Sequence, residues 1–288
     1  MIDELDLQFP VIDEGLSAII RPYSAKTGWT KMTLALAFVG RDGIVMATDS
    51  ANSVIEAGKV VDIITTKKLF LLNSRTGLAH SSQQAGVSDW MIRQFEPTMR
   101  DNKIDISKLQ YSQTVQLFTE YVREYMGHFT KDMPVSLLRS ESTAIAFILC
   151  GYDEHGEASI VQSISSSVPN AYIPDILPNK RCSFGVREET LYWLKVIERA
   201  GISIASLDVA TLKRLCVFLI QETIDRDPDY VRAPIQMIAI THDGGSFISG
   251  LELAKLAKPT IRTNNLDKIL HTLGIVNQKK LGGGGVNQ

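Results

Sequence analysis

The sequence predicts an α+β protein, because strand patterns and helix patterns occur in separate runs along the chain. The order is strands, two helices, strands, two helices, strands. A doubly wound parallel sheet would instead alternate single strands with single helices. The composition agrees with a globular protein, since 44% of the 288 residues are hydrophobic and 22% are charged. A chain of this length buries a large core and forms one large domain or two ordinary ones.

The first predicted strand pair begins at Thr33. Residues 33–39 alternate large and small side chains, and residues 44–49 form a second apolar strand. Between them, Gly40-Arg41-Asp42-Gly43 is typical of a hairpin turn. The two strands are therefore expected to pair directly.

Two turn geometries are compatible with this hairpin. A three-residue loop, residues 41–43, makes Ala35 face Asp49 and places Thr33 diagonally from Asp49 on the same face of the sheet. Such diagonal neighbours lie about 7–8 Å apart, which leaves room for a lysine ammonium between them. A two-residue loop, residues 42–43, places the two side chains on opposite faces. The sequence alone leaves both loops open.

The remaining elements follow from the same two periodicities. Short apolar or alternating runs bounded by turn residues predict strands, and apolar positions three and four residues apart predict helices. Strands are predicted over residues 68–72, 76–80, 142–151, 158–164, 235–241 and 246–249, and helices over residues 85–100, 112–129, 188–200 and 207–226.

Charge and apolar patterning exclude several classes of function. The chain has 30 Lys and Arg against 32 Asp and Glu, so it lacks the basic balance expected of a nucleic-acid-binding protein. Its apolar runs, such as residues 144–150, are far shorter than the roughly 20 residues of a membrane helix. The first six residues are acidic rather than basic, so no secretory signal is expected.

Cysteine and histidine usage point to a cytoplasmic protein without a metal or cofactor. Three cysteines, Cys150, Cys182 and Cys216, lie far apart, which fits buried reduced thiols better than a disulfide framework or a zinc finger. The chain contains no Gly-rich phosphate loop and no G-x-S-x-G elbow. No metal-ligand spacing occurs among the five histidines, which are His80, His128, His155, His242 and His271.

The stretch that carries chemistry runs from Thr33 to Leu72. It reads T-L-A-L-A-F-V-G-R-D-G-I-V-M-A-T-D-S and, further on, K-K-L-F-L-L. This text resembles the start of the β-type subunits of the proteasome, which are N-terminal-nucleophile hydrolases. The shared features are a strand that opens with Thr, a D-G hairpin, an apolar strand ending in A-x-D-S, and a later strand that opens with paired basic residues. Two further stretches, A-F-I-L-C-G-Y-D-E-H-G and A-P-I-Q-M-I-A-I-T-H-D-G-G, extend the resemblance over about residues 33–250.

The resemblance implies a fold and an assembly. The fold would be a four-layer α-β-β-α sandwich of two mostly antiparallel sheets. The assembly would be a homo-oligomer, with the subunits arranged in rings. An unfoldase partner is compatible with such a ring, but the sequence does not identify one.

The resemblance also implies roles for three residues. Thr33 would be the nucleophile, and its own α-amino group, once freed, would be the general base, because such an amine titrates near pH 7.7–8.0. The Lys68 ammonium would lower the pKa of that amine, and Asp49 would orient the lysine. Lys67 competes for the place of Lys68, since both faces of residues 67–72 are apolar, and only the resemblance favours Lys68.

Supporting positions match the family less well. Ser81 corresponds to the residue whose backbone amide would stabilise an oxyanion, and Asp227 corresponds to a late supporting aspartate, for which Asp229 is the alternative register. Three family positions that carry Arg, Ser and Ser are occupied here by Ala51, Val186 and Val231.

Thr33 can act only if it becomes the first residue. Residues 1–32 form either a propeptide removed by self-cleavage or an N-terminal extension that is not translated when synthesis starts at Met32. Both routes are open. The predicted domain then spans residues 33–277, followed by a flexible Gly-rich tail over residues 278–288.

The predicted function is a threonine-type peptidase that hydrolyses unfolded or short polypeptides through an acyl-enzyme ester. Two alternatives use the same fold. One is a non-catalytic ring subunit, which the missing Arg and Ser positions favour. The other is a hydrolase of small amides, for which the sequence specifies no substrate.

Overall fold

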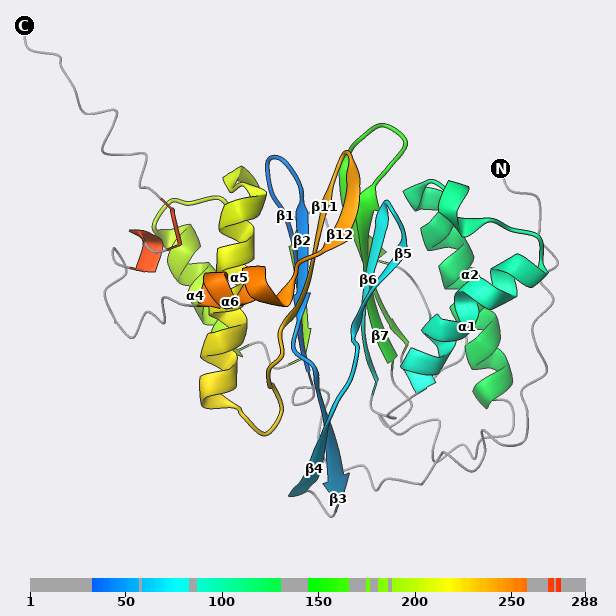
Figure 1. Ribbon diagram of the computed structural model, residues 1–288, viewed down its shortest axis with the longest axis horizontal. Coiled ribbons are helices and arrows are strands. Elements are labelled where there is room, and N and C mark those ends of the chain that lie inside the picture. The colour runs from blue at the N-terminus through cyan, green and yellow to red at the C-terminus, as the bar shows by residue number, and fades with distance from the viewer. Residues whose placement is uncertain are drawn as a thin grey trace, which may run out of the picture.

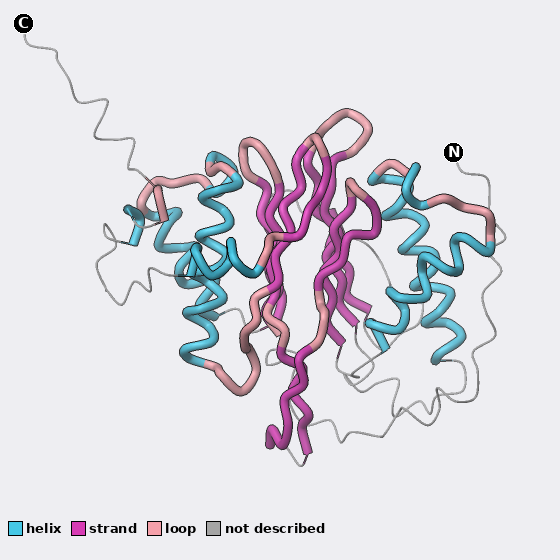
Figure 2. The backbone as a smooth tube through the Cα atoms, in the orientation of Figure 1, coloured by secondary structure: helices cyan, strands magenta, loops and turns pink. Residues whose placement is uncertain are grey.

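Two five-stranded antiparallel sheets form the framework of the protein (Figures 1 and 2). The computed structural model describes residues 33–56, 59–82, 87–130, 145–165, 175–176, 181–185, 188–257, 269–271 and 273–275. The predicted N-terminal extension and the predicted tail lie outside the described residues. Within them, the α+β organisation with antiparallel sheets is confirmed.

The first sheet has the strand order β10-β1-β2-β11-β12. All five residues of β2 and all six of β1 are buried, because both faces of these central strands are covered. The strands are β1 (Leu34–Val39), β2 (Ile44–Thr48), β10 (Arg181–Gly185), β11 (Gln236–Thr241) and β12 (Gly244–Phe247).

The second sheet has the strand order β5-β6-β7-β8-β9. Its centre is β7, whose eight residues are all buried. The strands are β5 (Leu69–Asn73), β6 (Thr76–Ser82), β7 (Ile145–Tyr152), β8 (Ala158–Ser165) and β9 (Asp175–Ile176).

Helices cover the outer face of each sheet, and the two sheets face each other (Figure 1). The helices α4, α5 and α6 lie beside the first sheet, and α1 and α2 lie beside the second. Their bounds are α1 (Val87–Asp101), α2 (Tyr111–Thr130), α4 (Glu188–Arg199), α5 (Val209–Arg226) and α6 (Gly250–Ala257), with short 3-10 helices η3 (Ile106–Lys108) and η5 (Ile204–Ser206) before α2 and α5.

Three hydrophobic clusters hold these elements together. One joins α4 and α5 to the first sheet, and another joins α1 and α2 to the second sheet. The third lies between the sheets and takes alternate residues from each strand, as the two-residue period of a strand requires. It includes Ala35, Ala37, Ile44, Met46, Ile238 and Ile240 from the first sheet, and Leu69, Ala79, Ala146, Ile148 and Cys150 from the second.

The turn between β1 and β2 differs from both predicted loops. Ala35 pairs with Thr48 and Val39 with Ile44, so the loop has four residues, 40–43, closed by a hydrogen bond from the Gly40 N–H to the Gly43 carbonyl. Neither predicted loop, residues 42–43 or residues 41–43, is therefore correct. Contacts distant in sequence hold the observed turn, because the Arg41 N–H donates to the Leu207 carbonyl and Asp42 accepts from the Val209 N–H.

The prediction also missed several elements. A separate two-stranded ribbon, β3 (Ala51–Glu56) and β4 (Lys59–Thr65), projects beyond both sheets between the site residues Asp49 and Lys68 (Figure 2). Its first strand, A-N-S-V-I-E, has neither the long apolar run nor the regular alternation that signals a strand. The short edge strands β9 and β10 and the eight-residue helix α6 were missed because they offer too few residues for a periodic pattern.

Candidate active site

Three residues singled out in the sequence meet at one buried point. Thr33 directly precedes β1, Asp49 directly follows β2, and Lys68 directly precedes β5. Lys68 Nζ donates a hydrogen bond to Thr33 Oγ1 at 2.6 Å and another to Asp49 Oδ1 at 3.0 Å. None of the three residues is more than 5% exposed. A hydroxyl, an ammonium and a carboxylate thus form one continuous polar chain inside the protein.

Asp49 is held from several directions. Its Oδ1 also accepts the Leu34 N–H at 3.0 Å, and its Oδ2 accepts the Ala51 N–H at 2.8 Å and the Arg232 N–H at 3.4 Å. Hydrogen bonds to a charged acceptor are among the stronger ones in proteins. The carboxylate therefore has a fixed orientation, and it fixes the lysine that it binds.

Strand alternation alone would not bring Thr33 and Asp49 together. In the observed register the N–H of Asp49 bonds to the carbonyl of Leu34, so a regular continuation would put Thr33 on the opposite face from Asp49. Both residues lie just outside their strands, however, and Thr33 has a φ of 100°. A positive φ is a genuine outlier for a β-branched residue. The backbone therefore leaves strand geometry at Thr33, the residue whose hydroxyl contacts Lys68.

The electrostatics of the site are dominated by burial. Burial lowers the pKa of Lys68 from its ordinary value, and the neighbouring Asp49 carboxylate opposes that effect. The Lys68–Asp49 ion pair is almost completely enclosed, with side-chain exposures of 5% and 0%. At such a site, a lysine remains charged mainly because its counterion stays in place.

The choice between Lys67 and Lys68 is decided by where the two ammonium groups lie. Lys67 Nζ stands 4.6 Å from the ring centre of Phe70 and 5.1 Å from that of Phe247, on the exposed surface. Lys68 alone of the two contacts Thr33 and Asp49. The catalytic role of Lys68 remains a prediction.

Ser81 and Asp227 are the two supporting residues that the resemblance implies. Ser81 follows His80, whose N–H donates to the Lys68 carbonyl, so Ser81 is one residue beyond the point where β6 meets Lys68. Asp227 caps the C-terminal end of α5, and in the described part of the chain no hydrogen bond joins its carboxylate to Thr33 or Lys68. Both assignments stay predictions.

Two residues that the sequence analysis did not select make contacts beside Lys68. Gln236 hydrogen-bonds to the backbone of residues 66 and 68, and His80 does so to that of residues 67 and 68. Gln236 could have been noticed as a polar residue in the alternating series formed with Ile238 and Ile240. His80 carried no comparable signal, since a lone histidine in a strand has many plain explanations.

The His80 ring is buried beneath the site. Nδ1 lies 2.7 Å from Ser88 Oγ and Nε2 lies 3.2 Å from the Lys67 carbonyl oxygen. Because a carbonyl only accepts, Nε2 carries the proton. Burial lowers the pKa of His80 to about 4; the Lys67 carbonyl and Asp89 oppose this shift, and Lys68 and Arg93 add to it.

We expect the folded state to lose stability as the pH falls from 6.5 to 4. In that window an unfolded His80 binds a proton and the folded one does not, so acid favours unfolding. The loss in the free energy of unfolding is about 3 kcal/mol, measurable by urea unfolding at several pH values. His80→Gln should flatten this slope, whereas His155→Gln in an exposed turn should not. Equal slopes in wild type and His80→Gln would contradict the assignment.

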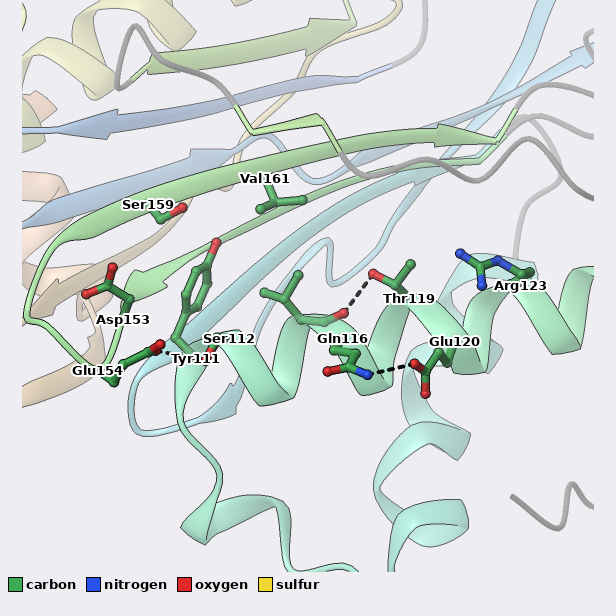
Figure 3. A pocket seen from close by; sticks show the side chains of 11 residues that line it. Tyr111, Ser112, Gln116, Thr119, Glu120, Arg123, Asp153, Glu154, Ser159 and Val161 are labelled. Atoms are coloured by element: carbon green, nitrogen blue, oxygen red, sulfur yellow. Dashed lines mark hydrogen bonds between the residues drawn. The ribbon is translucent and has the colours of Figure 1, made fainter. Parts of the chain in front are cut away.

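A separate cavity of about 500 Å³ opens between α2 and the β7–β8 hairpin (Figure 3). The stretch of α2 from Tyr111 to Arg123 forms one wall, and Asp153, Glu154, Ser159 and Val161 form the other. Its polar groups already bind one another in part, as Ser112 does to Glu154. None of the candidate catalytic residues lines it.

The described residues contain no group of three or more His, Cys, Asp or Glu placed to hold a metal ion. In the same ranges, no helix is both long enough and apolar enough to cross a bilayer.

Comparisons with known proteins bear on the fold. No protein-family model matches the sequence, and no curated protein sequence matches it significantly. Among solved structures, the Anbu (Gly-1) mutant from Hyphomicrobium sp. strain MC1 superposes with a TM-score of 0.57 at 15% identity, covering 78% of this chain and 92% of that one. Anbu (ancestral beta-subunit) from Yersinia bercovieri superposes with a TM-score of 0.58 at 12% identity, covering 89% and 100%. At these identities the likeness establishes a shared fold.

Proposed function

We propose that the protein is an N-terminal-nucleophile hydrolase, specifically a threonine-type peptidase in which Thr33 is the nucleophile. The observation that carries this proposal is the buried contact of Lys68 Nζ with both Thr33 Oγ1 (2.6 Å) and Asp49 Oδ1 (3.0 Å). An isolated buried ammonium is costly, and here it is aimed at a hydroxyl that is otherwise a weak nucleophile. A structural ion pair would not need to contact the threonine.

The proposed reaction uses groups of this chain only. The free α-amine of Thr33 takes the hydroxyl proton while Oγ1 attacks the carbonyl carbon of the scissile amide. The C–N bond breaks, the leaving amine takes the proton, and an ester to Thr33 remains. A water molecule then attacks the ester and releases the acid and free Thr33. The Lys68 ammonium keeps the α-amine neutral near neutral pH by lowering its pKa.

The backbone at Thr33 supports release of the segment before it. A β-branched residue at φ 100° stores about 1–3 kcal/mol of strain. Because φ of Thr33 is the rotation about its N–Cα bond relative to the carbonyl carbon of residue 32, cleavage of the peptide bond between residues 32 and 33 removes the constraint. We infer that the chain is processed between Met32 and Thr33, so that residues 1–32 act as a propeptide; removal of an initiating Met32 would give the same first residue.

The wider context of the proposal rests on the fold. The layered arrangement in Figure 1 fits the four-layer α-β-β-α sandwich of the N-terminal-nucleophile hydrolases. The name of one structural neighbour describes it as an ancestral β-subunit, which supports self-association of this chain as well. We propose a homo-oligomeric ring that acts on polypeptides in the cytoplasm, with or without an unfoldase.

A non-catalytic ring subunit is the second candidate. It is favoured by Val231, which stands where the family has a supporting serine and is fully buried in the cluster beneath the first sheet. Ala51, in place of the family arginine, supplies only its N–H to Asp49. This candidate leaves the contact between Lys68 and Thr33 without a purpose.

Intact-mass spectrometry of the purified protein tests the proposal. Wild type is expected to lose residues 1–32. It should then react with an inhibitor directed at N-terminal threonine and carry one inhibitor adduct per chain. Thr33→Ala should keep the segment and form no adduct, because the nucleophile is absent. Thr76→Ala, which removes another buried threonine hydroxyl, should behave as wild type.

One result would argue against the enzyme, and another against self-processing alone. An uncleaved wild type without an adduct would favour the non-catalytic subunit. A Thr33→Ala chain that begins at residue 33 as efficiently as wild type would argue against self-cleavage, because another protease, or synthesis from Met32 followed by methionine removal, would then expose residue 33.

A further inference from the structure

The backbone segment that presents Lys68 is held from both sheets by side-chain and backbone groups that no catalytic step uses. Gln236 is the first residue of β11 and pairs with Thr48, the residue before Asp49. It shares a strand face with Ile238 and Ile240, which belong to the cluster between the sheets. Its side chain therefore extends from the first sheet toward the segment that enters the second.

The Gln236 carboxamide binds this segment at two points. Its Oε1 accepts the Lys68 N–H at 3.0 Å, and its Nε2 donates to the Thr66 carbonyl at 2.6 Å. These two backbone groups flank residue 67 and face the same way, as they would toward a neighbouring strand. One amide side chain thus replaces a residue of a partner strand, which is possible because it carries both a donor and an acceptor.

His80, from the second sheet, holds the same segment. Its N–H donates to the Lys68 carbonyl at 3.1 Å and its ring Nε2 lies 3.2 Å from the Lys67 carbonyl. The backbone of residues 66–68, from which the Lys68 side chain extends, is consequently fixed by contacts from both sheets. Since the lysine side chain has four flexible bonds, its ammonium can be placed reproducibly only if its Cα is fixed.

We propose that Gln236 is a positioning residue: its amide sets the place from which Lys68 reaches Thr33 and Asp49. The catalytic consequence rests on the proposed function, but the positioning itself does not. Small displacements of a reacting or tuning group cost large factors in rate. Loss of the amide should therefore move the Lys68 ammonium away from the Thr33 hydroxyl. This effect is expected although the Gln236 side chain forms its hydrogen bonds with the backbone of residues 66 and 68 and not with Thr33 or Asp49.

The test measures Lys68 directly in Gln236→Met, which keeps the length of the side chain and removes both hydrogen bonds. Reductive methylation with formaldehyde, read by peptide mass spectrometry, reports how often the Lys68 amine becomes accessible. We expect its labelling rate to rise at least about tenfold, both in the otherwise wild-type chain and in a Thr33→Ala background. Gln221→Met is the matched control, because that amide binds Asp225 on the exposed surface of α5.

A kinetic readout separates positioning from general destabilisation. In Gln236→Met the acid limb of the pH profile for inhibitor acylation should move upward, toward the 7.7–8.0 of an unperturbed α-amine. A variant that was merely less stable would lose amplitude without this displacement. Gln236→Glu, which keeps the acceptor for Lys68 and loses the donor to Thr66, should lie between Gln236→Met and wild type in Lys68 labelling.

The outcomes are distinguishable. Unchanged labelling of Lys68 in a folded Gln236→Met would overturn the positioning role, whatever the activity. Increased labelling in a protein whose wild type never reacts with the inhibitor would uphold the positioning and reject the proposed function. If the variants do not fold, hydrogen exchange of wild type decides: the Lys68 amide should be strongly protected, and rapid exchange would overturn the proposal.

Discussion

Lys68→Met is expected to abolish most of the reactivity of Thr33 and to destabilise the fold. Without the ammonium, the α-amine of Thr33 returns toward its ordinary pKa and the hydroxyl loses its 2.6 Å partner. We expect acylation by a threonine-directed inhibitor to slow by about 10²–10⁴-fold. The same change leaves the Asp49 carboxylate buried without its counterion, which should lower the free energy of unfolding by about 3–5 kcal/mol.

Lys67→Met is the matched control for this variant. It removes an ammonium from the adjacent residue, where the group lies over two aromatic rings at the surface. An exposed cation–π contact is worth about 0.5–1 kcal/mol, so stability should change little and acylation should be unaffected. Equal losses in the two variants, measured by urea unfolding and inhibitor kinetics, would refute the specific role of Lys68.

Asp49→Asn is expected to have the second-largest effect. The aspartate accepts the Lys68 ammonium and the backbone N–H groups of Leu34, Ala51 and Arg232. An asparagine has one acceptor oxygen, and its NH₂ would oppose at least one of these donors. The free energy of unfolding should fall by about 3–5 kcal/mol, because the change leaves a buried cation unpaired. The pKa of Lys68 should fall further, since burial is then no longer opposed by the carboxylate.

The effect should be visible in activity as well as in stability. With Lys68 partly neutral, the basic limb of the pH profile is expected to move to lower pH in Asp49→Asn. Asp89→Asn provides the contrast, because it breaks an exposed ion pair with Arg93 at 2.7 Å, and such pairs contribute about 0–1 kcal/mol. A basic limb unchanged from wild type in Asp49→Asn would show that the carboxylate does not maintain the lysine charge.

The hairpin that carries Thr33 and Asp49 shows which features could be predicted from neighbouring residues alone. The alternation of residues 33–39 and 44–49 correctly identified two paired strands. It could not specify the loop, because the four-residue turn is held by contacts with Leu207 and Val209, which lie more than 160 positions further on. The three-residue loop that would place Thr33 and Asp49 on one face has the wrong register. The two residues lie just outside their strands, and Lys68 Nζ joins them by bonding to both.

The ribbon of β3 and β4 shows a related gap. Between Asp49 and Lys68 the sequence analysis predicts no strand. This segment forms a two-stranded sheet of its own, and an isolated pair of this kind is marginal in water. Its first strand, A-N-S-V-I-E, has no regular period from which a strand could be predicted.

Periodicity was sufficient to determine the α+β class and most of the strands and helices, and the resemblance of the local text to a known family pointed to Thr33, Asp49 and a lysine at 67 or 68. The surroundings of Lys67 and Lys68, the departure of Thr33 from strand geometry and the contribution of Gln236 required the folded chain. The side-chain hydrogen bonds of Lys68 and Gln236 join groups that are 19 to 170 positions apart in sequence. Side-chain periods describe only the face on which a residue lies, whereas the packing of two sheets determines which buried polar groups meet and how well they are paired.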